Sequence, residues 1–454
     1  MLRKLSFTNF KTWAAADLVC GRVTGLFGTN SSGKTSLLQF LLLLKQTKEA
    51  TDRALSLELN GPYVELGTIR DAIHRHDETK GIDFSLGFEL EQTLILRDWT
   101  KIGSAGRLAE GREIILTSEI AVHQKAPRAR RLSYRLGNLE VALTQGRRAD
   151  ASFDLTPRDE GSGFRFIRTQ GRQWPVPGPV KAYAFPDQVR TYFQNAGFLS
   201  DLEVAYEAAI DRIFYLGPLR DYPKRDYLWA RSRPIDVGQR GEKAIDAILA
   251  ATTSDETRNL RYKGPRWPFQ KMIAHWLREM GLIHDFRVEE IAEGSNRWQA
   301  KVITRPGGSE VLLTDVGFGV SQVLPVITLL HYVPEGSTVI LEQPEIHLHP
   351  LAQAGLADVI ISAATHRKVQ VIVESHSEHL LLRLQRRIAE EAIAADDVKL
   401  YFCDAPRGVS KLTLLAVDLF GRVTNWPDKF MGDAFGEAAK AELARLKRMR
   451  VAAE

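Results

Sequence analysis

A glycine-rich segment near the start of the chain has the residue types and the spacing of a phosphate-binding loop. Gly28-Thr-Asn-Ser-Ser-Gly33-Lys34-Thr35 fits the pattern GxxxxGK[ST] at every fixed position. Glycines let backbone N–H groups and a helix N-terminus converge on phosphate oxygens. Lys34 would then reach the β- and γ-phosphates, and the Thr35 hydroxyl would bind Mg²⁺. The alternative is an ordinary glycine turn, which matches the pattern by chance in about one chain in a hundred of this length.

The pattern therefore predicts a site for a nucleoside triphosphate, ATP, with Mg²⁺. The residues expected to contact the nucleotide in this loop are Gly28, Asn30, Ser31, Ser32, Gly33, Lys34, Thr35 and Ser36. The neighbouring elements suit this role. The apolar run 22–27 predicts a buried strand, and 36–45 predicts a helix, so the loop has the strand-loop-helix setting that the motif requires.

Polar residues with related chemistry follow in the last third of the chain. The apolar run 337–341 predicts a strand that ends in Glu342, Gln343 and Glu345, where a carboxylate could hold Mg²⁺ directly or through water. A second strand-like run, 371–377, ends in a polar turn with His376. Ahead of both, the glycine-rich turn 315–322 opens a predicted helix. Taken singly, each feature has an ordinary explanation as a solvated strand end, a helix cap or a tight turn.

The order of these four segments resembles the nucleotide-binding head of ABC ATPases. The likeness is closer to the RecF, SMC and OLD branch, in which a soluble head is split by an insertion. The segments 9–11 and 345–350 also resemble that branch. Within that branch the chain resembles a bacterial AAA-family subfamily with GFGVSQ and EQPEIHLHP motifs. Its markers are the segments 216–220, 236–242, 317–322 and 342–345. The resemblance covers nearly the whole chain.

This resemblance implies that two copies of the chain close head to tail on ATP. Gly317, Gly319 and Ser321 of one copy would contact the γ-phosphate held by the other, and His376 would sense that phosphate. The glycine-serine turn departs from the usual Leu-Ser-Gly-Gly form of the signature. The resemblance thus implies a homodimer or higher oligomer.

One departure from the family bears on the chemistry. The usual Asp that binds Mg²⁺ and the Glu that polarises the attacking water are replaced by Glu342 and Gln343. A glutamine can hold water but cannot accept its proton, and a positioned base contributes ~10²–10⁴ in rate. We therefore expect slow hydrolysis unless Glu345 replaces the missing base. The expected catalytic residues are Glu345, Gln343 and His376, and the expected metal ligands are Thr35 and Glu342.

The predicted fold class is α/β: an ABC-ATPase head with a mainly parallel P-loop sheet, an antiparallel β lobe and a helical insertion. Alternating strand and helix patterns in the last third predict the parallel sheet, and short β-like runs such as 131–141 and 164–167 predict an antiparallel meander. The expected divisions are 1–82 for the first part of the head, 83–180 for the β lobe, 181–284 for the helical insertion, 285–430 for the rest of the head and 431–454 for a C-terminal helix.

Composition adds few constraints. The chain has 454 residues, a net charge of +5 and only two cysteines, Cys20 and Cys403, which are far apart and have no metal-ligand spacing. No run is long and apolar enough to span a membrane, and no signal peptide is apparent, so we expect a cytoplasmic protein. A basic stretch from Lys125 to Arg148 makes DNA contact possible, although nearby acids favour an ordinary solvated surface.

Two functional hypotheses remain open at this point. In the first, the chain is a dimerising ATPase subunit of a DNA-directed or anti-phage defence or repair system, with a separate nuclease or toxin as effector. In the second, it is a nucleotide-gated scaffold that sequesters or triggers that effector, with little turnover and no DNA contact. The motifs themselves indicate only ATP, and the resemblance carries the biological setting.

Overall fold

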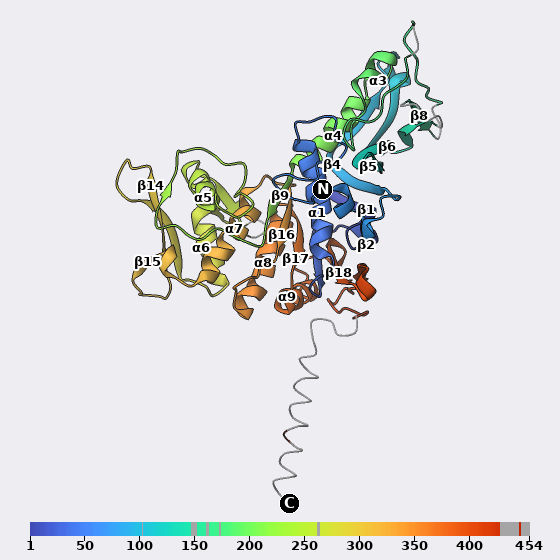
Figure 1. The fold of residues 1–454 in the computed structure, drawn as a ribbon. Coiled ribbons are helices and arrows are strands. Elements are labelled where there is room, and N and C mark those ends of the chain that lie inside the picture. Colours follow the sequence, from blue (N-terminus) through green and yellow to red (C-terminus); the bar gives the residue numbers. More distant parts are fainter. Residues whose placement is uncertain are drawn as a thin grey trace, which may run out of the picture.

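The computed structural model describes residues 1–101, 103–146, 152–159, 163–171, 174–260, 264–426 and 445 (Figure 1). The helix expected over 431–454 lies outside these residues, apart from residue 445. None of the helices in the described part of the chain combines the length and the apolar character that crossing a membrane requires.

A six-stranded, mainly parallel sheet forms the centre of the molecule (Figure 1). Its order is β19-β18-β3-β17-β16-β9, and only the edge strand β19 runs antiparallel to its neighbour. The strands are β3 (Val23–Gly28), β9 (Ile213–Leu216), β16 (Thr338–Glu342), β17 (Gln370–Glu374), β18 (Val398–Asp404) and β19 (Lys411–Leu415). Strands β3, β16 and β17 are buried nearly throughout, as expected for strands covered on both faces. This arrangement confirms the predicted parallel P-loop sheet.

The two faces of this sheet belong to two separate hydrophobic cores. Successive side chains of a strand point to opposite faces, so Ile340 and Ile372 pack into one core while Val339 and Val371 pack into the other. The first core holds α1 (Lys34–Glu49), which is buried between the central sheet and the antiparallel lobe. The second core holds the helices α5 (Ala244–Thr253), α6 (Phe269–Glu279), α7 (Phe318–Tyr332), α8 (Pro350–His366) and α9 (Glu378–Ala389).

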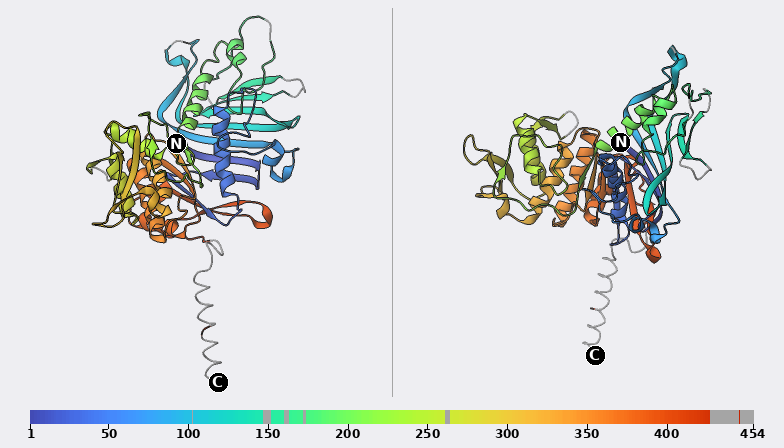
Figure 2. Two further views of the ribbon diagram at one scale, coloured as in Figure 1. Left: turned by 60° about the vertical axis from the view of Figure 1, so that its left-hand side comes forward. Right: turned by 45° about the horizontal axis from the view of Figure 1, so that its top comes forward.

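A seven-stranded antiparallel sheet forms the β lobe, in the order β2-β1-β4-β5-β6-β7-β8 (Figure 2). The strands are β1 (Leu2–Phe10), β2 (Trp13–Val19), β4 (Ile82–Arg97), β5 (Arg107–His123), β6 (Ala126–Leu136), β7 (Leu139–Gln145) and β8 (Phe153–Asp159), accompanied by the helices α3 (Asp187–Tyr192) and α4 (Leu199–Asp211). The run 131–141, expected as one strand, is a hairpin, because Gly137 adopts φ +55° and Leu136 pairs with Leu139. The expected strand 164–167 is not formed.

A third body, the helical lobe, carries α5 to α7 and small antiparallel sheets (Figure 1). Its strands are β10 (Tyr227–Leu228), β11 (Thr257–Asn259), β12 (Arg266–Pro268), β13 (Asp285–Glu290), β14 (Arg297–Ile303) and β15 (Glu310–Leu312). The remaining short elements are α2 (Ile69–Ala72) and 3₁₀ turns at His74–His76, Gly103–Gly106, Leu313–Asp315, Ala395–Asp397 and Pro406–Gly408.

The sheets divide the chain differently from the expected boundaries. β1 and β2 lie in the segment expected to be head, yet β1 pairs with both β2 and β4, so the two strands belong to the sheet of the β lobe. β9 lies in the expected helical insertion, yet it is a strand of the central sheet. Conversely, β14 pairs with β10, β13 and β15 in the helical lobe, and none of these strands joins the central sheet. Each difference arises because strand pairing over long sequence separations is not visible in local patterns.

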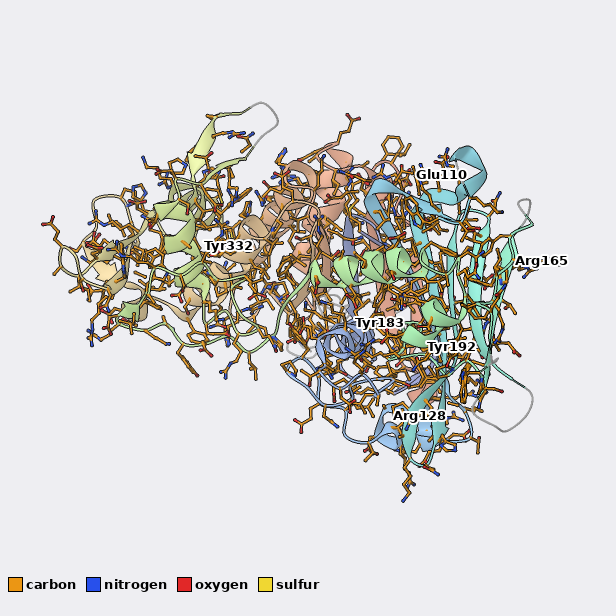
Figure 3. The ribbon with its side chains drawn as sticks, turned by 90° about the horizontal axis from the view of Figure 1, so that it is seen from above. Glu110, Arg128, Arg165, Tyr183, Tyr192 and Tyr332 are labelled. Carbon is orange, nitrogen blue, oxygen red and sulfur yellow. The ribbon has the colours of Figure 1, made fainter. Side chains whose placement is uncertain are left out.

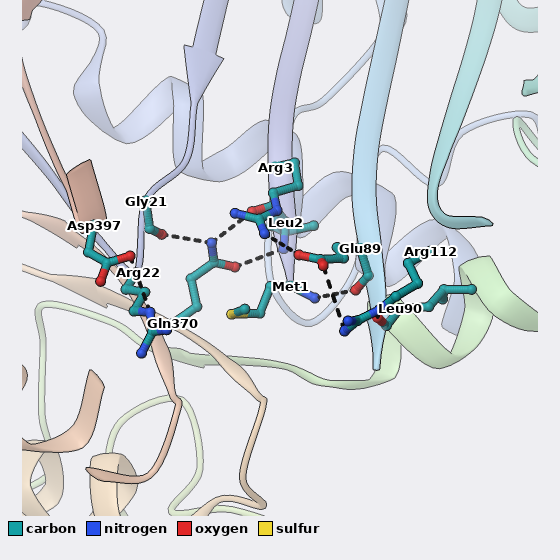
Figure 4. Close-up of polar contacts among 10 residues, drawn as sticks. All are labelled: Met1, Leu2, Arg3, Gly21, Arg22, Glu89, Leu90, Arg112, Gln370 and Asp397. Atoms are coloured by element: carbon teal, nitrogen blue, oxygen red, sulfur yellow. Dashed lines mark hydrogen bonds and ion pairs between the residues drawn. The ribbon is translucent and has the colours of Figure 1, made fainter. Parts of the chain in front are cut away.

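The side chain of Gln370 ties the β lobe to the central sheet (Figure 4). Its Nε2 donates to the carbonyl oxygens of Leu2 and Gly21 at 2.7 and 2.8 Å, and its Oε1 accepts from the Leu2 N–H at 2.8 Å. The Thr338 hydroxyl also donates to this Oε1. The amide of Gln370 is buried and hydrogen-bonded through both its oxygen and its nitrogen, so it fixes the start of β1 in the β lobe against β17 of the central sheet.

Candidate nucleotide-binding site

The phosphate loop connects β3 to α1 in a backbone conformation that glycine alone accommodates at two positions. Gly28 has φ +142° and Gly33 has φ +92°. A Cβ atom on Gly28 would lie 2.0 Å from the Cys403 carbonyl oxygen of the adjacent strand β18. The loop therefore lies directly against its neighbouring strand, and the motif glycines are required by space as well as by φ.

Residues from both ends of the chain hold the far end of the loop. The Trp13 Nε1–H donates to the Gly33 carbonyl oxygen at 3.0 Å, and Trp13 is fully buried. The Ser410 hydroxyl donates to the Thr12 hydroxyl at 2.6 Å, and both atoms lie within 3 Å of the Cβ position at Gly33. Sequence analysis did not assign Thr12, Trp13 or Ser410 to the site. Only the proximity of Trp13 to the marker segment 9–11 pointed in this direction.

Lys34 folds back over the loop that it terminates. Its ammonium donates to the carbonyl oxygens of Gly28 and Thr29 at 3.1 and 2.7 Å, and the residue is buried. Burial lowers the pKa of Lys34, and the Glu374 carboxylate opposes this by favouring the charged form. A buried cation at the mouth of a helix N-terminus suits the binding of an anionic group.

The loop borders an open pocket of about 430 Å³. Nine of the predicted site residues line it together, namely Asn30, Ser31, Ser32, Gly33, Lys34, Thr35, Ser36, Gln343 and His376, along with the unpredicted Thr12 and Glu374. Glu342, Glu345, Gly28, Gly317, Gly319 and Ser321 do not line it. The central sheet therefore brings the loop, the Gln343 turn and the His376 turn to one place.

Glu374 is a further pocket residue that sequence analysis did not assign to the site. It ends β17, the strand between β3 and β16, and the Thr35 hydroxyl donates to its carboxylate with oxygen-oxygen distances of 3.0 and 2.9 Å. The Gln343 N–H donates to its carbonyl oxygen at 2.8 Å. Burial raises the pKa of Glu374, and hydrogen bonding from Thr35 and the charge of Lys34 oppose this. The sequence signal for Glu374 was its position at a strand end, two residues before His376. That position points to the pocket only once the order of the strands is known.

Glu342 faces away from the pocket, towards β9. Its Oε1 accepts a hydrogen bond from the Tyr215 hydroxyl at 3.1 Å, and its backbone carbonyl accepts one from the Arg220 Nη2 at 3.2 Å. Burial, reinforced by the nearby Glu374 carboxylate, raises the pKa of Glu342 to about 7. The carboxylate expected to hold the metal therefore lies beside Glu374 and behind the pocket wall.

This raised pKa predicts a pH-dependent stability difference for Glu342→Gln. In the unfolded chain Glu342 ionises near its ordinary pKa, but in the folded chain it ionises at about 7, so the wild type loses stability as pH rises between these values. The glutamine variant lacks this loss and can still accept from Tyr215. We expect the variant to gain about 3 kcal/mol over the wild type between pH 4.5 and pH 7.5, at 1.36 kcal/mol per pKa unit. Urea unfolding of both proteins at the two pH values measures this gain. The same difference in unfolding free energy at both pH values would contradict the burial argument.

Glu345 and His376 meet beneath the turn that follows β17. The His376 backbone N–H donates to Glu345 Oε1 at 2.6 Å, and Glu345 is buried. Burial raises the pKa of Glu345, while burial and the charge of Lys34 lower the pKa of His376. The Glu345 carboxylate thus supports the backbone of the His376 turn, and the imidazole itself is exposed at the pocket.

The glycine-serine turn lies at the N-terminus of α7 in the helical lobe. Gly317 is exposed, and a Cβ there would meet no atom within 4 Å. A Cβ on Gly319 would lie 3.0 Å from the His347 carbonyl oxygen. Ser321 is only 6% exposed, and its hydroxyl donates to the Phe318 carbonyl oxygen at 2.8 Å. The open part of this turn is therefore the backbone at Gly317, while the Ser321 hydroxyl is used within its own helix.

The marker segment between β9 and α5 bridges the two ends of the site. Arg220 is 4% exposed and donates to the Glu342 carbonyl oxygen, as above, while its Nε and Nη1 have no hydrogen-bond partner in the described part of the chain. The Tyr222 ring packs on Phe318 with centroids 5.4 Å apart. A Cβ on Gly241 would lie 2.5 Å from the Pro325 Cβ of α7. The segment thus joins the carboxylate strand to the glycine-serine helix.

The basic stretch of the β lobe is partly neutralised. Arg131 pairs with Glu119 and Glu140 at 3.3 and 3.4 Å, and Arg130 pairs with Glu119 at 3.4 Å. Arg128 lies at the edge of this lobe, far across the molecule from Tyr332 of the helical lobe (Figure 3). Arg147 and Arg148 lie outside the described residues. These contacts favour the interpretation of a solvated surface over that of a DNA-binding stripe.

The strand order, the phosphate loop and the flanking lobes define the class of protein, an ABC-type P-loop head of mixed α/β fold. A family model described as "AAA domain, putative AbiEii toxin, Type IV TA system" matches residues 23–383, and one described as "Protein of unknown function (DUF3696)" matches residues 393–440. Since the first match spans well over half of the sequence, the chain belongs to this AAA domain family.

Solved structures of SMC heads are similar to the chain at low identity. The SMC head domain from Thermotoga maritima has a TM-score of 0.42 at 12% identity, covering 92% of this chain and 99% of that one. An SmcHead bound to the C-winged helix domain of ScpA has a TM-score of 0.43 at 12% identity, covering 92% and 98%. An Smc head domain with an extended coiled coil, bound to the C-terminal domain of ScpA derived from Pyrococcus furiosus, has a TM-score of 0.40 at 10% identity, covering 91% and 96%. A search of curated protein sequences finds no significant match.

Proposed function

We propose that the chain is an ATP-binding head that hydrolyses ATP slowly and associates with a second copy of itself when ATP is bound. The observation that carries this proposal is the pocket in which the phosphate loop, the Thr35–Glu374 pair, Gln343 and His376 converge. Loop N–H groups and the N-terminus of α1 bind the phosphates, and Lys34 exchanges its two carbonyl contacts for phosphate oxygens.

The residues present fit Mg²⁺ bound with the nucleotide. No cluster of three or more His, Cys, Asp or Glu side chains suited to a metal occurs in the described part of the chain. Mg²⁺ usually keeps several waters and binds substrate phosphates, and Thr35 offers on the pocket wall the hydroxyl that a phosphate loop supplies to Mg²⁺. Bound there, Mg²⁺ would neutralise charge developing on the phosphates.

The proposed association follows from the position of the glycine-serine turn. The N-terminus of α7 is exposed at Gly317 but contributes nothing to the pocket of its own chain. A helix N-terminus favours anionic groups, so the turn suits the γ-phosphate bound by another copy. In this arrangement each site needs the loop of one chain and α7 of another, with the Gly317 and Gly319 backbone in contact and Ser321 holding the turn.

A mixing experiment tests the composite site. Lys34→Ala removes the loop's cation, and Gly317→Asp places a negative charge at the open end of α7, where the side chain meets no neighbour. We expect each variant alone to lose ATP turnover, and an equimolar mixture to recover part of it, because a mixed dimer contains one intact site. A mixture as inactive as its components would show that each chain works on its own ATP. Sedimentation with and without Mg²⁺-ATP would report the association itself.

For the biological setting, we propose a cytoplasmic subunit of a defence or toxin–antitoxin system that acts through a separate effector. The family description names a putative AbiEii toxin of a type IV system. A nucleotide-gated scaffold remains the second candidate, since Gln343 on the pocket wall favours slow turnover. The rate of ATP hydrolysis with and without duplex DNA distinguishes the two candidate functions. Hydrolysis stimulated by DNA supports the DNA-directed role, and a slow rate that is unaffected by DNA supports the scaffold.

A further inference from the structure

The chain has a buried carboxylate on the pocket wall beside the phosphate loop. Of the three buried carboxylates near the loop, Glu342 is turned to Tyr215 and Glu345 to the His376 backbone, and neither lines the pocket. Glu374 does line it. It is 2% exposed, yet its carboxylate accepts from the Thr35 hydroxyl at the first turn of α1, where the terminal phosphates arrive.

Gln343 and Glu374 occupy neighbouring positions on the pocket wall. Their strands β16 and β17 are parallel neighbours, and the register places Glu342 opposite Glu374. The Gln343 N–H donates to the Glu374 carbonyl oxygen, and Gln343 has φ +43°, which turns its side chain out of the strand line. The Gln343 amide and the Glu374 carboxylate can therefore both form hydrogen bonds to one water molecule between them.

We infer that Glu374 is the catalytic residue that orients and deprotonates the attacking water, in place of the carboxylate missing at Gln343. This inference rests on the ATP-binding function proposed above. In the step, the water oxygen forms a bond to the γ-phosphorus while the bond from that phosphorus to the β,γ-bridging oxygen breaks, and its electron pair leaves on ADP. The water proton passes to the Glu374 carboxylate and from there to a phosphate oxygen. Gln343 holds the water and takes no proton.

The test compares Glu374→Gln with Glu345→Gln in the full chain. The amide at 374 can still accept from Thr35, so we expect ATP affinity, measured by calorimetry with Mg²⁺, to stay at the wild-type value. Single-turnover hydrolysis should fall by about 10²-fold or more, and the ATP-bound assembly should persist in sedimentation because its nucleotide is not consumed. Glu345→Gln, which alters the support of the His376 turn, should lower the rate less than Glu374→Gln does. Glu374→Asp, which retains a shorter carboxylate, serves if the glutamine variant does not fold.

A residue swap makes the test sharper. Gln343→Glu in the Glu374→Gln background returns the carboxylate to β16 and leaves an amide on β17, and we expect it to restore much of the lost rate. Three results would overturn the inference: Glu374→Gln hydrolysing at the wild-type rate, Glu345→Gln stopping hydrolysis instead, or ATP affinity falling as far as the rate, which would make Glu374 a metal-holding residue only. If the wild type itself binds no ATP, the proposed function fails before this comparison begins.

Discussion

Lys34→Ala is expected to weaken Mg²⁺-ATP binding by at least ~100-fold while the protein stays folded. Hydrogen bonds to charged groups contribute about 1.5–3 kcal/mol each, and Lys34 would lose two or more of them to phosphate, which is at least two factors of ten. We expect the fold to tolerate the loss of this cation. Burial lowers the pKa of Lys34, so the charged side chain is held at a cost in the nucleotide-free protein. Calorimetric titration with ATP and a thermal melt measure both effects.

Lys45→Ala is the matched control on the same helix. Lys45 is also nearly buried, but its ammonium pairs with Glu49 at 2.9 Å and lies over the Tyr63 ring, away from the phosphate loop. We expect wild-type ATP affinity in this variant and, at most, a small loss of stability. Equal weakening of ATP binding in both variants would mean that helix α1 as a whole, and not the loop cation, determines affinity.

Gly28→Ala is expected to have the largest effect on folding. The new Cβ would lie 2.0 Å from the Cys403 carbonyl oxygen and 2.9 Å from its carbonyl carbon, at a φ of +142° that side chains rarely adopt. Relief requires β3 and β18 to separate in the middle of the central sheet. We expect the free energy of unfolding to fall by about 3–5 kcal/mol, the size typical of severe core and backbone strain. Urea unfolding followed by circular dichroism measures it.

Gly317→Ala provides the comparison for the same chemical change. Gly317 has φ −55° and no atom within 4 Å of the added Cβ. Its free energy of unfolding should equal that of the wild type or exceed it by up to about 1 kcal/mol, because alanine fits this conformation and restricts the unfolded chain. If Gly28→Ala were as harmless as Gly317→Ala, the close approach of the loop to β18 would be refuted.

Local patterns predicted the elements of the central sheet well because its strands are buried on both faces. The expected strands 337–341 and 398–403 correspond to β16 and β18 within one residue at each end. Such continuous apolar runs, bounded by polar turns, are read from a single segment. The hairpin at Gly137 and the edge strand β9 were missed, since a two-residue turn and a four-residue strand have little local signature.

The sequence motif predicted part of the lining of the pocket beside the phosphate loop but not all of it. The loop residues from Asn30 to Ser36, with Gln343 and His376, line one pocket as their spacing implied. Glu374 was missed because its neighbour in space, Thr35, is more than three hundred residues away in the chain, and only the insertion of β17 between β3 and β16 brings them together. The roles of Glu342 and Glu345 depend on the direction in which each side chain points at the strand end. The hydrogen bonds that they accept from Tyr215 and from the His376 N–H determine this direction.

The contacts that hold the phosphate loop come from distant parts of the chain, and this has a consequence for biosynthesis. Gly33 is held by Trp13 and Thr12 from the first hairpin and by Ser410 beyond β18, while Gly28 rests on Cys403. A ribosome releases the first of these partners early and the last only after some four hundred residues have been joined. A nascent chain therefore carries the complete GxxxxGK[ST] motif long before β18 and Ser410 are made, and the pocket that we propose to bind ATP is complete only after them.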